Sequence, residues 1–190
     1  MLDKNLLDLV KPQGSLITRQ PKLSFPNNKK TEEVLLEFVV RNLAKTVDAF
    51  LIHNQVPAIG SIVYCNLALA FEHTGIYVGN NKIVHLNGNG RIEKVSFQKF
   101  IERLDGNNLS FSIFCAVDKN GESIGSNKIA ERALKMVGLR RDYNVAIDNC
   151  HRFTNYCLTG KNSMITSFTM LEEELKLNYG FANWRAIDMS

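Results

Sequence analysis

The sequence contains no run of about 18 or more apolar residues free of charge, and this absence excludes a membrane-spanning helix. The first residues lack the basic start, apolar stretch and small-residue cleavage site of a secretory signal. We therefore expect a cytoplasmic protein, and peripheral contact with a membrane stays open. Basic residues exceed acidic ones by only 23 to 19, spread along the chain. Nucleic-acid binders need a concentrated basic patch, so nucleic acid is not an expected partner.

Cysteine and histidine are also scarce, with four of each in 190 residues. No two cysteines form a Cys-x-x-Cys pair, and the histidines are not paired at zinc-finger spacing. A disulfide scaffold and a structural zinc site are therefore not expected, and nothing in the sequence implies a cofactor. We expect free thiols in a reducing compartment, at Cys65, Cys115, Cys150 and Cys157.

The chain is long enough for one domain with a small appendage, and 45% of its residues are apolar. Residues 31–53 carry apolar side chains at three-to-four spacing with charges between them, which predicts an amphipathic helix. We assign residues 1–56 to an N-terminal helical extension and residues 57–190 to the main domain. The helix either covers a flank of the domain or meets a membrane surface or a partner.

After residue 57 the apolar pattern changes to a period of two, which is typical of strands. Strands are predicted over residues 61–64, 71–78, 82–86, 92–95 and 109–117. Helices are predicted over residues 97–104, 127–137, 149–158 and 171–177, with Ser126 as a cap and Gly160 as a stop. Strands in the middle and helices at both ends favour an α+β fold, in which an antiparallel sheet packs against helices.

The predicted hairpin over residues 71–86 gathers two histidines. A three-residue loop, 79–81, pairs Ile76 with Val84 and places the aliphatic side chains of both strands on one face. The same register puts His73 diagonal to His85 on the other face, where the backbones of diagonal neighbours lie roughly 7–8 Å apart. One sheet face is therefore apolar, and the other carries both imidazoles.

Cys150 is the candidate nucleophile, because it stands at a predicted helix start. The helix dipole and the first backbone N–H groups favour a thiolate there and would stabilise an oxyanion. Gly75, opposite His85, leaves room for a third group, so His73 and His85 could serve as base and orienting group. The alternative from spacing alone is that Cys150 only packs in the core and the strand histidines only form hydrogen bonds.

Four stretches of the chain resemble the lecithin:retinol acyltransferase-like family, also called the NC-domain family. They are Gly60-Ser61-Ile62-Val63-Tyr64, then Glu72-His73-Thr74-Gly75-Ile76-Tyr77-Val78-Gly79, then Val84-His85-Leu86, and Asn149-Cys150-His151-Arg152-Phe153-Thr154-Asn155-Tyr156. The preceding segment, 129–138, is similar as well. The resemblance runs from about Pro57 to Gly160, and its motifs occur in the family's order.

The resemblance implies a circularly permuted NlpC-type, papain-like fold and acyl chemistry on phospholipid-type esters through a thioester. It implies Cys150 as nucleophile, His73 as general base and His85 as the orienting third member. Three positions, in two places, depart from the family pattern. Thr74 stands where tryptophan is usual, and His151-Arg152 replaces glutamate-histidine.

Three functions remain open at this point. The first is a cysteine-dependent acyl hydrolase or acyltransferase, whose partner would be a lipid or another acyl-bearing small molecule. The second is an NlpC-type peptidase or amidase acting on peptide or cell-wall amide bonds, and the third is a binding module without catalysis. His151 is expected at the surface or behind the site, Tyr64 and Tyr77 could line the site, and the three other cysteines are expected to pack in the core.

Overall fold

The structure, a computed structural model, describes residues 55–68, 71–102, 112–144 and 148–189. All of them belong to one of two compact units, Ala44–Ser190. The helix predicted over residues 31–53 lies outside the described residues, as does the N-terminal extension up to residue 54. The assignment of residues 1–56 and 57–190 to separate parts stays a prediction.

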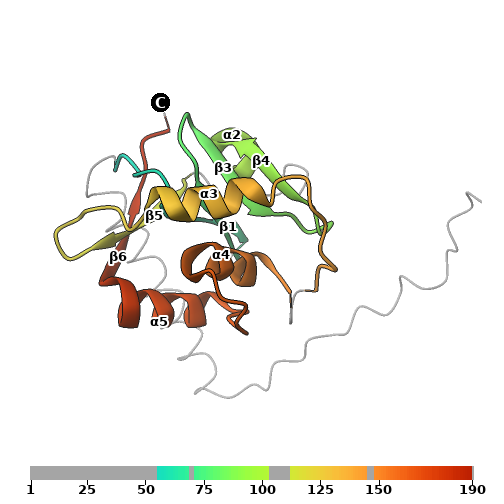
Figure 1. Cartoon of the computed structure of the whole chain (residues 1–190). Helices are drawn as coiled ribbons and strands as arrows, with labels where there is room; N and C mark the ends of the chain where they lie inside the picture. Colours follow the sequence, from blue (N-terminus) through green and yellow to red (C-terminus); the bar gives the residue numbers. More distant parts are fainter. Residues whose placement is uncertain (1–54, 69–70, 103–111, 145–147, 190) are drawn as a thin grey trace, which may run out of the picture. The chain divides into compact units, whose positions relative to one another are not determined.

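Six strands form one sheet in the order β4-β3-β2-β1-β5-β6. Every neighbouring pair is antiparallel. The strands are β1 Ile62–Ala68, β2 Phe71–Tyr77, β3 Lys82–Leu86, β4 Ile92–Ser96, β5 Phe114–Asp118 and β6 Phe181–Ala186 (Figure 1). Consecutive strands β1 to β4 pair with their chain neighbours, so the part of the sheet that carries the histidines is built from local hairpins.

Four helices lie within the described ranges, and each begins at a polar side chain that caps its first turn. They are α2 Phe97–Ile101, α3 Asn127–Lys135, α4 Cys150–Thr159 and α5 Phe168–Tyr179. Serine oxygens accept backbone N–H groups at the starts of α2, α3 and α5, and Asn149 does so for α4. Helices α4 and α5 end at Gly160 and Gly180, whose φ angles of 74° and 69° suit glycine.

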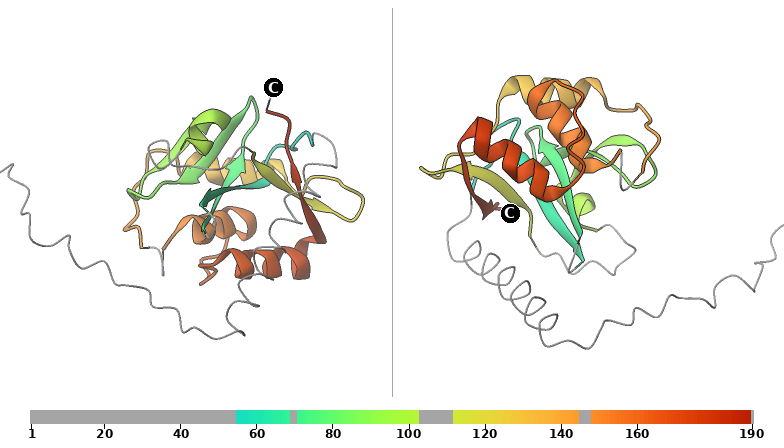
Figure 2. Two further views of the ribbon diagram at one scale, coloured as in Figure 1. Left: turned by 180° about the vertical axis from the view of Figure 1, so that it is seen from behind. Right: turned by 90° about the horizontal axis from the view of Figure 1, so that it is seen from below.

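Strand alternation divides the core into two layers, one on each face of the sheet. Ile62, Ile76 and Val84 face the layer formed with α3, α4 and α5. Val63, Cys65 and Ile83 face the opposite layer, to which α2 contributes Phe97, Phe100 and Ile101. Figure 1 shows α4 between α3 and α5, and Figure 2 shows these three helices across the strands from α2.

The hairpin between β2 and β3 has the predicted register. Ile76 pairs with Val84, and the N–H of Val78 donates to the carbonyl of Lys82 at 2.9 Å. The three loop residues, 79–81, all adopt positive φ angles, which glycine and asparagine tolerate. Because this register holds, both histidines lie on the face away from Ile76 and Val84, and they share that face with Ile83.

Gly75 has a different role from the predicted one. A Cβ built on it would lie 2.7 Å from Ile83 Cγ2 and 3.2 Å from His85 Cβ. The space beside Gly75 is therefore filled by strand β3 itself. Glycine permits this close strand packing, and it does not reserve room for a further catalytic group as the sequence suggested.

Most of the predicted elements are confirmed, and three differ in extent. Strand β1 continues to Ala68, beyond the predicted end at residue 64, and helix α5 covers Phe168–Tyr179 rather than residues 171–177. Strand β5 begins at Phe114, so residues 112 and 113, which the prediction included, precede it. Strands β2, β3 and β4 and helices α3 and α4 lie where the sequence placed them, within one or two residues. Strand β6 was not predicted, although its residues Phe181 and Trp184 are buried in the core. The prediction of an antiparallel sheet packed against helices is confirmed.

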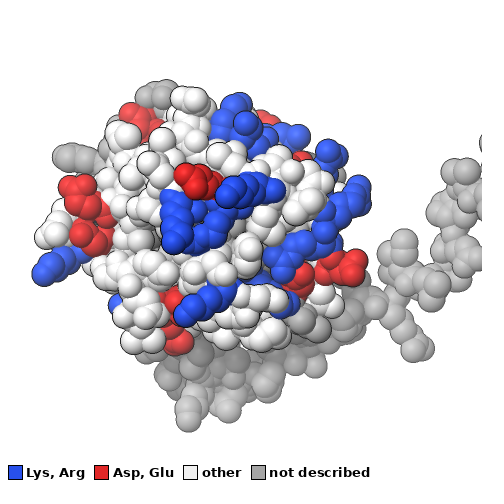
Figure 3. All heavy atoms as spheres, in the orientation of Figure 1, with Lys and Arg blue, Asp and Glu red and all other residues white. Residues whose placement is uncertain are grey.

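The surface carries mixed charge. Figure 3 shows acidic side chains among the basic ones on the face that carries α3, with basic side chains in the majority.

Within the part of the chain that the structure describes, no helix combines the length and apolar character needed to cross a membrane.

Candidate active site

The two predicted histidines are in direct contact. His73 on β2 and His85 on β3 are both buried, and His73 Nε2 lies 3.1 Å from His85 Nδ1. Their ring centroids are 5.0 Å apart, and the rings meet edge to face at 82°. The diagonal register, which the sequence predicted, therefore brings the two imidazoles within hydrogen-bond distance.

Phe100 of α2 encloses this pair on the apolar side. Its ring centroid lies 5.1 Å from that of His73 and 5.5 Å from that of His85. Cys65, paired with His73 across β1 and β2, directs its Sγ toward the carbonyl of Phe100 at 3.6 Å. An apolar wall lowers the local dielectric constant and thereby strengthens the hydrogen bond between the imidazoles.

A carboxylate that the sequence analysis missed completes the histidine cluster. Glu93 on β4 is the cross-strand partner of His85, and its Oε1 lies 3.4 Å from His85 Nε2. Asn87 Nδ2 donates to the same oxygen at 3.2 Å. The turn signal at residues 88–90 could have revealed this contact, because a hairpin around that turn pairs residue 85 with residue 93.

Cys150 is the first residue of α4, and its position depends on Asn149. The Oδ1 of Asn149 accepts the N–H groups of His151 and Arg152 at 3.1 and 3.2 Å. Its Nδ2 donates to the carbonyl of Thr166 at 2.6 Å, which ties the cap to the segment before α5. Cys150 itself is only 4% exposed. The predicted helix start is confirmed, and Asn149 is its cap.

The first turn of α4 offers an oxyanion fewer backbone N–H groups than the sequence suggested. Besides the two N–H groups held by Asn149 Oδ1, the N–H of Phe153 donates to the carbonyl of Asn149 at 3.1 Å. Three of the first four N–H groups are therefore engaged by the cap residue. An oxyanion near Cys150 would have to be stabilised by donors other than these three.

Two of the positions that depart from the family pattern, Thr74 and His151, contact each other. Thr74 Oγ1 lies 3.3 Å from His151 Nδ1, and the hydroxyl of Thr154 donates to Thr74 Oγ1 at 3.1 Å. Since Thr74 accepts from Thr154, its own proton is available for Nδ1 of His151. This contact joins the residue after His73 to the residue after Cys150.

His151 is buried, which excludes the surface position and leaves the expected position behind the site. Its exposed fraction is 8%, and burial lowers its pKa from 6.5 to about 4. The imidazole is therefore neutral at pH 7. It packs near Phe168, with ring centroids 6.0 Å apart.

The other cysteines pack in the core, as predicted. Burial raises the pKa values of the Cys115 and Cys157 thiols to about 12, so both are protonated and unreactive at neutral pH. None of the four cysteines forms a disulfide, and all four are buried. Of the four, Cys150 alone stands at a helix start.

Of the two tyrosines expected to line the site, Tyr64 lies in the aromatic core. It stacks on Phe114 with ring centroids 5.0 Å apart and contacts Phe168 and Trp184. Burial raises the pKa of its hydroxyl. Tyr77 packs on Phe97 with ring centroids 5.7 Å apart, in the layer that α2 covers.

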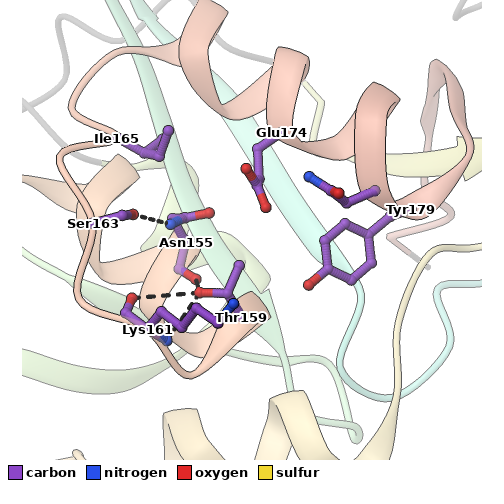
Figure 4. A pocket seen from close by; sticks show the side chains of 8 residues that line it. Asn155, Thr159, Lys161, Ser163, Ile165, Glu174 and Tyr179 are labelled. Atoms are coloured by element: carbon purple, nitrogen blue, oxygen red, sulfur yellow. Dashed lines mark hydrogen bonds between the residues drawn. The ribbon is translucent and has the colours of Figure 1, made fainter.

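A polar cavity of about 490 Å³ lies beside the C-terminal half of α4, which the sequence did not predict. Its lining comes from α4, the following loop and α5, namely Asn155, Thr159, Lys161, Ser163, Ile165, Glu174, Asn178 and Tyr179. Figure 4 shows the carboxamide nitrogen of Asn155 bonded to Ser163. No group of three or more metal-ligating side chains occurs in the described ranges.

Part of the chain that contains the site is similar to known proteins. The sequence model of the family described as lecithin retinol acyltransferase matches residues 55–163, a range that contains His73, His85 and Cys150. The human protein named phospholipase A and acyltransferase 2 is 25% identical over 117 residues. That alignment covers 55% of this chain and 72% of the human protein.

Proposed function

Because the chain belongs to the lecithin retinol acyltransferase family, we propose that it transfers or hydrolyses the acyl groups of lipid esters, with Cys150 as the nucleophile. The name of the human relative points to phospholipids as the class of acyl donor. The observation that carries the proposal is the contact of His73 with His85 over 3.1 Å, on strands against which α4 packs. The resemblance also makes a permuted papain-like topology part of this proposal.

Cys150 would pass its proton to His73. Helix α4 packs against β2, and the chain neighbours of these two residues, His151 and Thr74, are 3.3 Å apart at their side chains. Since His73 Nε2 faces His85, we assign the other ring nitrogen, Nδ1, as the acceptor of the thiol proton. The start of α4 favours the resulting thiolate, because the helix dipole presents positive charge there.

The reaction would proceed in two halves. In the first, Cys150 Sγ attacks the ester carbonyl, the bond to the alcohol oxygen breaks, and His73 gives its proton to the departing alcohol. In the second, water or another acceptor attacks the acyl-cysteine while His73 removes its proton. The acyl group leaves sulfur, and the imidazole returns the proton to the thiolate. Water as acceptor makes the protein a hydrolase, and an alcohol or amine makes it an acyltransferase.

The proposal is tested by turnover of phosphatidylcholine and phosphatidylethanolamine vesicles, read as release or transfer of fatty acyl groups. Cys150→Ala should abolish turnover, and Cys157→Ala on the same helix serves as the matched control. Full activity in Cys150→Ala would refute the mechanism. Cleavage of peptide amides by the wild type without lipid turnover would instead favour the peptidase or amidase alternative.

A further inference from the structure

The carboxylate of Glu93 is placed for a defined task in the histidine cluster. It stands opposite His85 in the register of β3 and β4, with Oε1 3.4 Å from Nε2. The His85 side chain is fully buried, whereas that of Glu93 is 24% exposed, so the carboxylate reaches from the rim of the sheet toward the buried ring.

Asn87 fixes the orientation of this carboxylate. Its Oδ1 accepts the N–H groups of Asn89 and Arg91, each at 2.9 Å, and thereby closes the turn between β3 and β4. Because the oxygen is committed to these donors, the amide nitrogen must be the atom that faces Glu93. It donates to Oε1 over 3.2 Å. Glu93 is thus held from one side by the turn and faces the imidazole on the other.

The chain of contacts favours one placement of the imidazole protons. A carboxylate only accepts hydrogen bonds, so Nε2 of His85 carries a proton and Nδ1 carries a lone pair. That lone pair accepts the proton on Nε2 of His73 across 3.1 Å. His73 is left with a lone pair on Nδ1, which is the form a general base needs.

We propose that Glu93, held by Asn87, is a positioning residue that sets the tautomers of His85 and His73 and stabilises the positive charge formed when His73 takes the thiol proton. This inference rests on the proposed function and extends its site by two residues. The titratable groups that face the imidazole pair are Glu93 from β4, Cys65 from β1 and, on the proposal above, Cys150 from α4. Helix α2 contributes the ring of Phe100.

The test compares Glu93→Gln with wild type in the rate at which iodoacetamide alkylates Cys150 at different pH values, read by peptide mass spectrometry. Without the carboxylate, the protonated form of His73 is less stable. Cys150 should therefore form its thiolate at a pH about one unit higher than in the wild type. Turnover of phospholipid vesicles at neutral pH should fall roughly tenfold, because a charge-assisted contact becomes a neutral one. Glu93→Asp should recover part of both effects. Glu131→Gln, on the exposed face of α3, is the matched control and should change neither.

Two outcomes separate this inference from the proposed function. If the alkylation of wild-type Cys150 follows the pH dependence of an ordinary thiol, the cysteine is not activated and the proposed function fails. If wild-type Cys150 is activated and Glu93→Gln shows the same pH profile, the role of Glu93 is refuted.

A measurement on the wild-type protein gives a second test that needs no variant. Long-range ¹H–¹⁵N spectra of the imidazole rings, recorded above the pH at which they protonate, should show the Nε2–H tautomer for both His73 and His85. The Nδ1–H tautomer at either ring would overturn the inference.

Discussion

Two polar clusters lie on opposite faces of β2, and they start from neighbouring residues. His73 belongs to the cluster with His85 and Glu93, and Thr74 belongs to the cluster with His151 and Thr154. The first cluster contains a carboxylate, so it can stabilise a protonated imidazole. The second offers only hydroxyl groups to a buried ring, and burial lowers the pKa of His151 to about 4. The partner of the imidazole therefore decides whether a buried histidine can carry charge.

The largest predicted effect is a difference in activity between a variant of the first cluster and a variant of the second. His73→Gln removes the proposed base and should lower turnover of phospholipid vesicles by about 10²–10⁴-fold. His151→Asn keeps a polar side chain in the neutral cluster and should retain most of the activity. Vesicle assays at neutral pH measure both variants. Equal losses of activity in the two variants would show that the second cluster takes part in the chemistry, and would contradict the distinction between the clusters.

The pH dependence of stability should come next in size. The folded-state pKa of His151, about 4, is lower than the unfolded value of 6.5, so the unfolded chain binds more protons between these pH values. The contribution of His151 is therefore complete above pH 6.5 and declines as the pH falls toward 4. Between pH 7 and 5 the free energy of unfolding should drop by about 2 kcal/mol on this account.

Urea unfolding at several pH values measures this decline, and His151→Asn is the control. The variant should lack the part of the decline that His151 causes. An identical slope in the variant and the wild type would show that His151 does not titrate on unfolding as described.

A smaller loss of stability should follow when the hydrogen bonds between β2 and α4 are removed. Thr74→Val keeps the shape of the side chain but removes the hydroxyl that contacts His151 and Thr154. Both partners stay buried, so we expect a loss of about 1–3 kcal/mol in the free energy of unfolding. Thermal and urea unfolding check the value. Thr159→Val, whose hydroxyl bonds only near the exposed end of α4, should cost less.

The parts of the site that the sequence predicted are local. The register of the β2–β3 hairpin depends on loop length and on which residues alternate as apolar, and both can be read over a few residues. The start of α4 follows from Asn149 and the glycine stop ten residues beyond Cys150. These local rules place the imidazoles on one face and the thiol at a helix start.

The parts that were missed depend on contacts between distant segments or on irregular backbone. Strand β6 buries Phe181 and Trp184, which are three residues apart, and its pairing with β5 shifts between Val117 and Asp118. This spacing hides the two-residue period of a strand. The burial of His151 follows from α4 packing on β2, and the polar cavity from α4 and α5 lying together. None of these contacts leaves a local pattern in the sequence.

The central claim is that Cys150 carries the acyl group, and the most direct measurement is mass spectrometry of the protein quenched in acid during turnover of phospholipid vesicles. The account predicts a fatty-acyl mass on the peptide that contains Cys150, released by neutral hydroxylamine as a thioester should be. Product formation with the acyl group on another residue, or with no acyl-enzyme in either a rapid or a prolonged incubation, would contradict it.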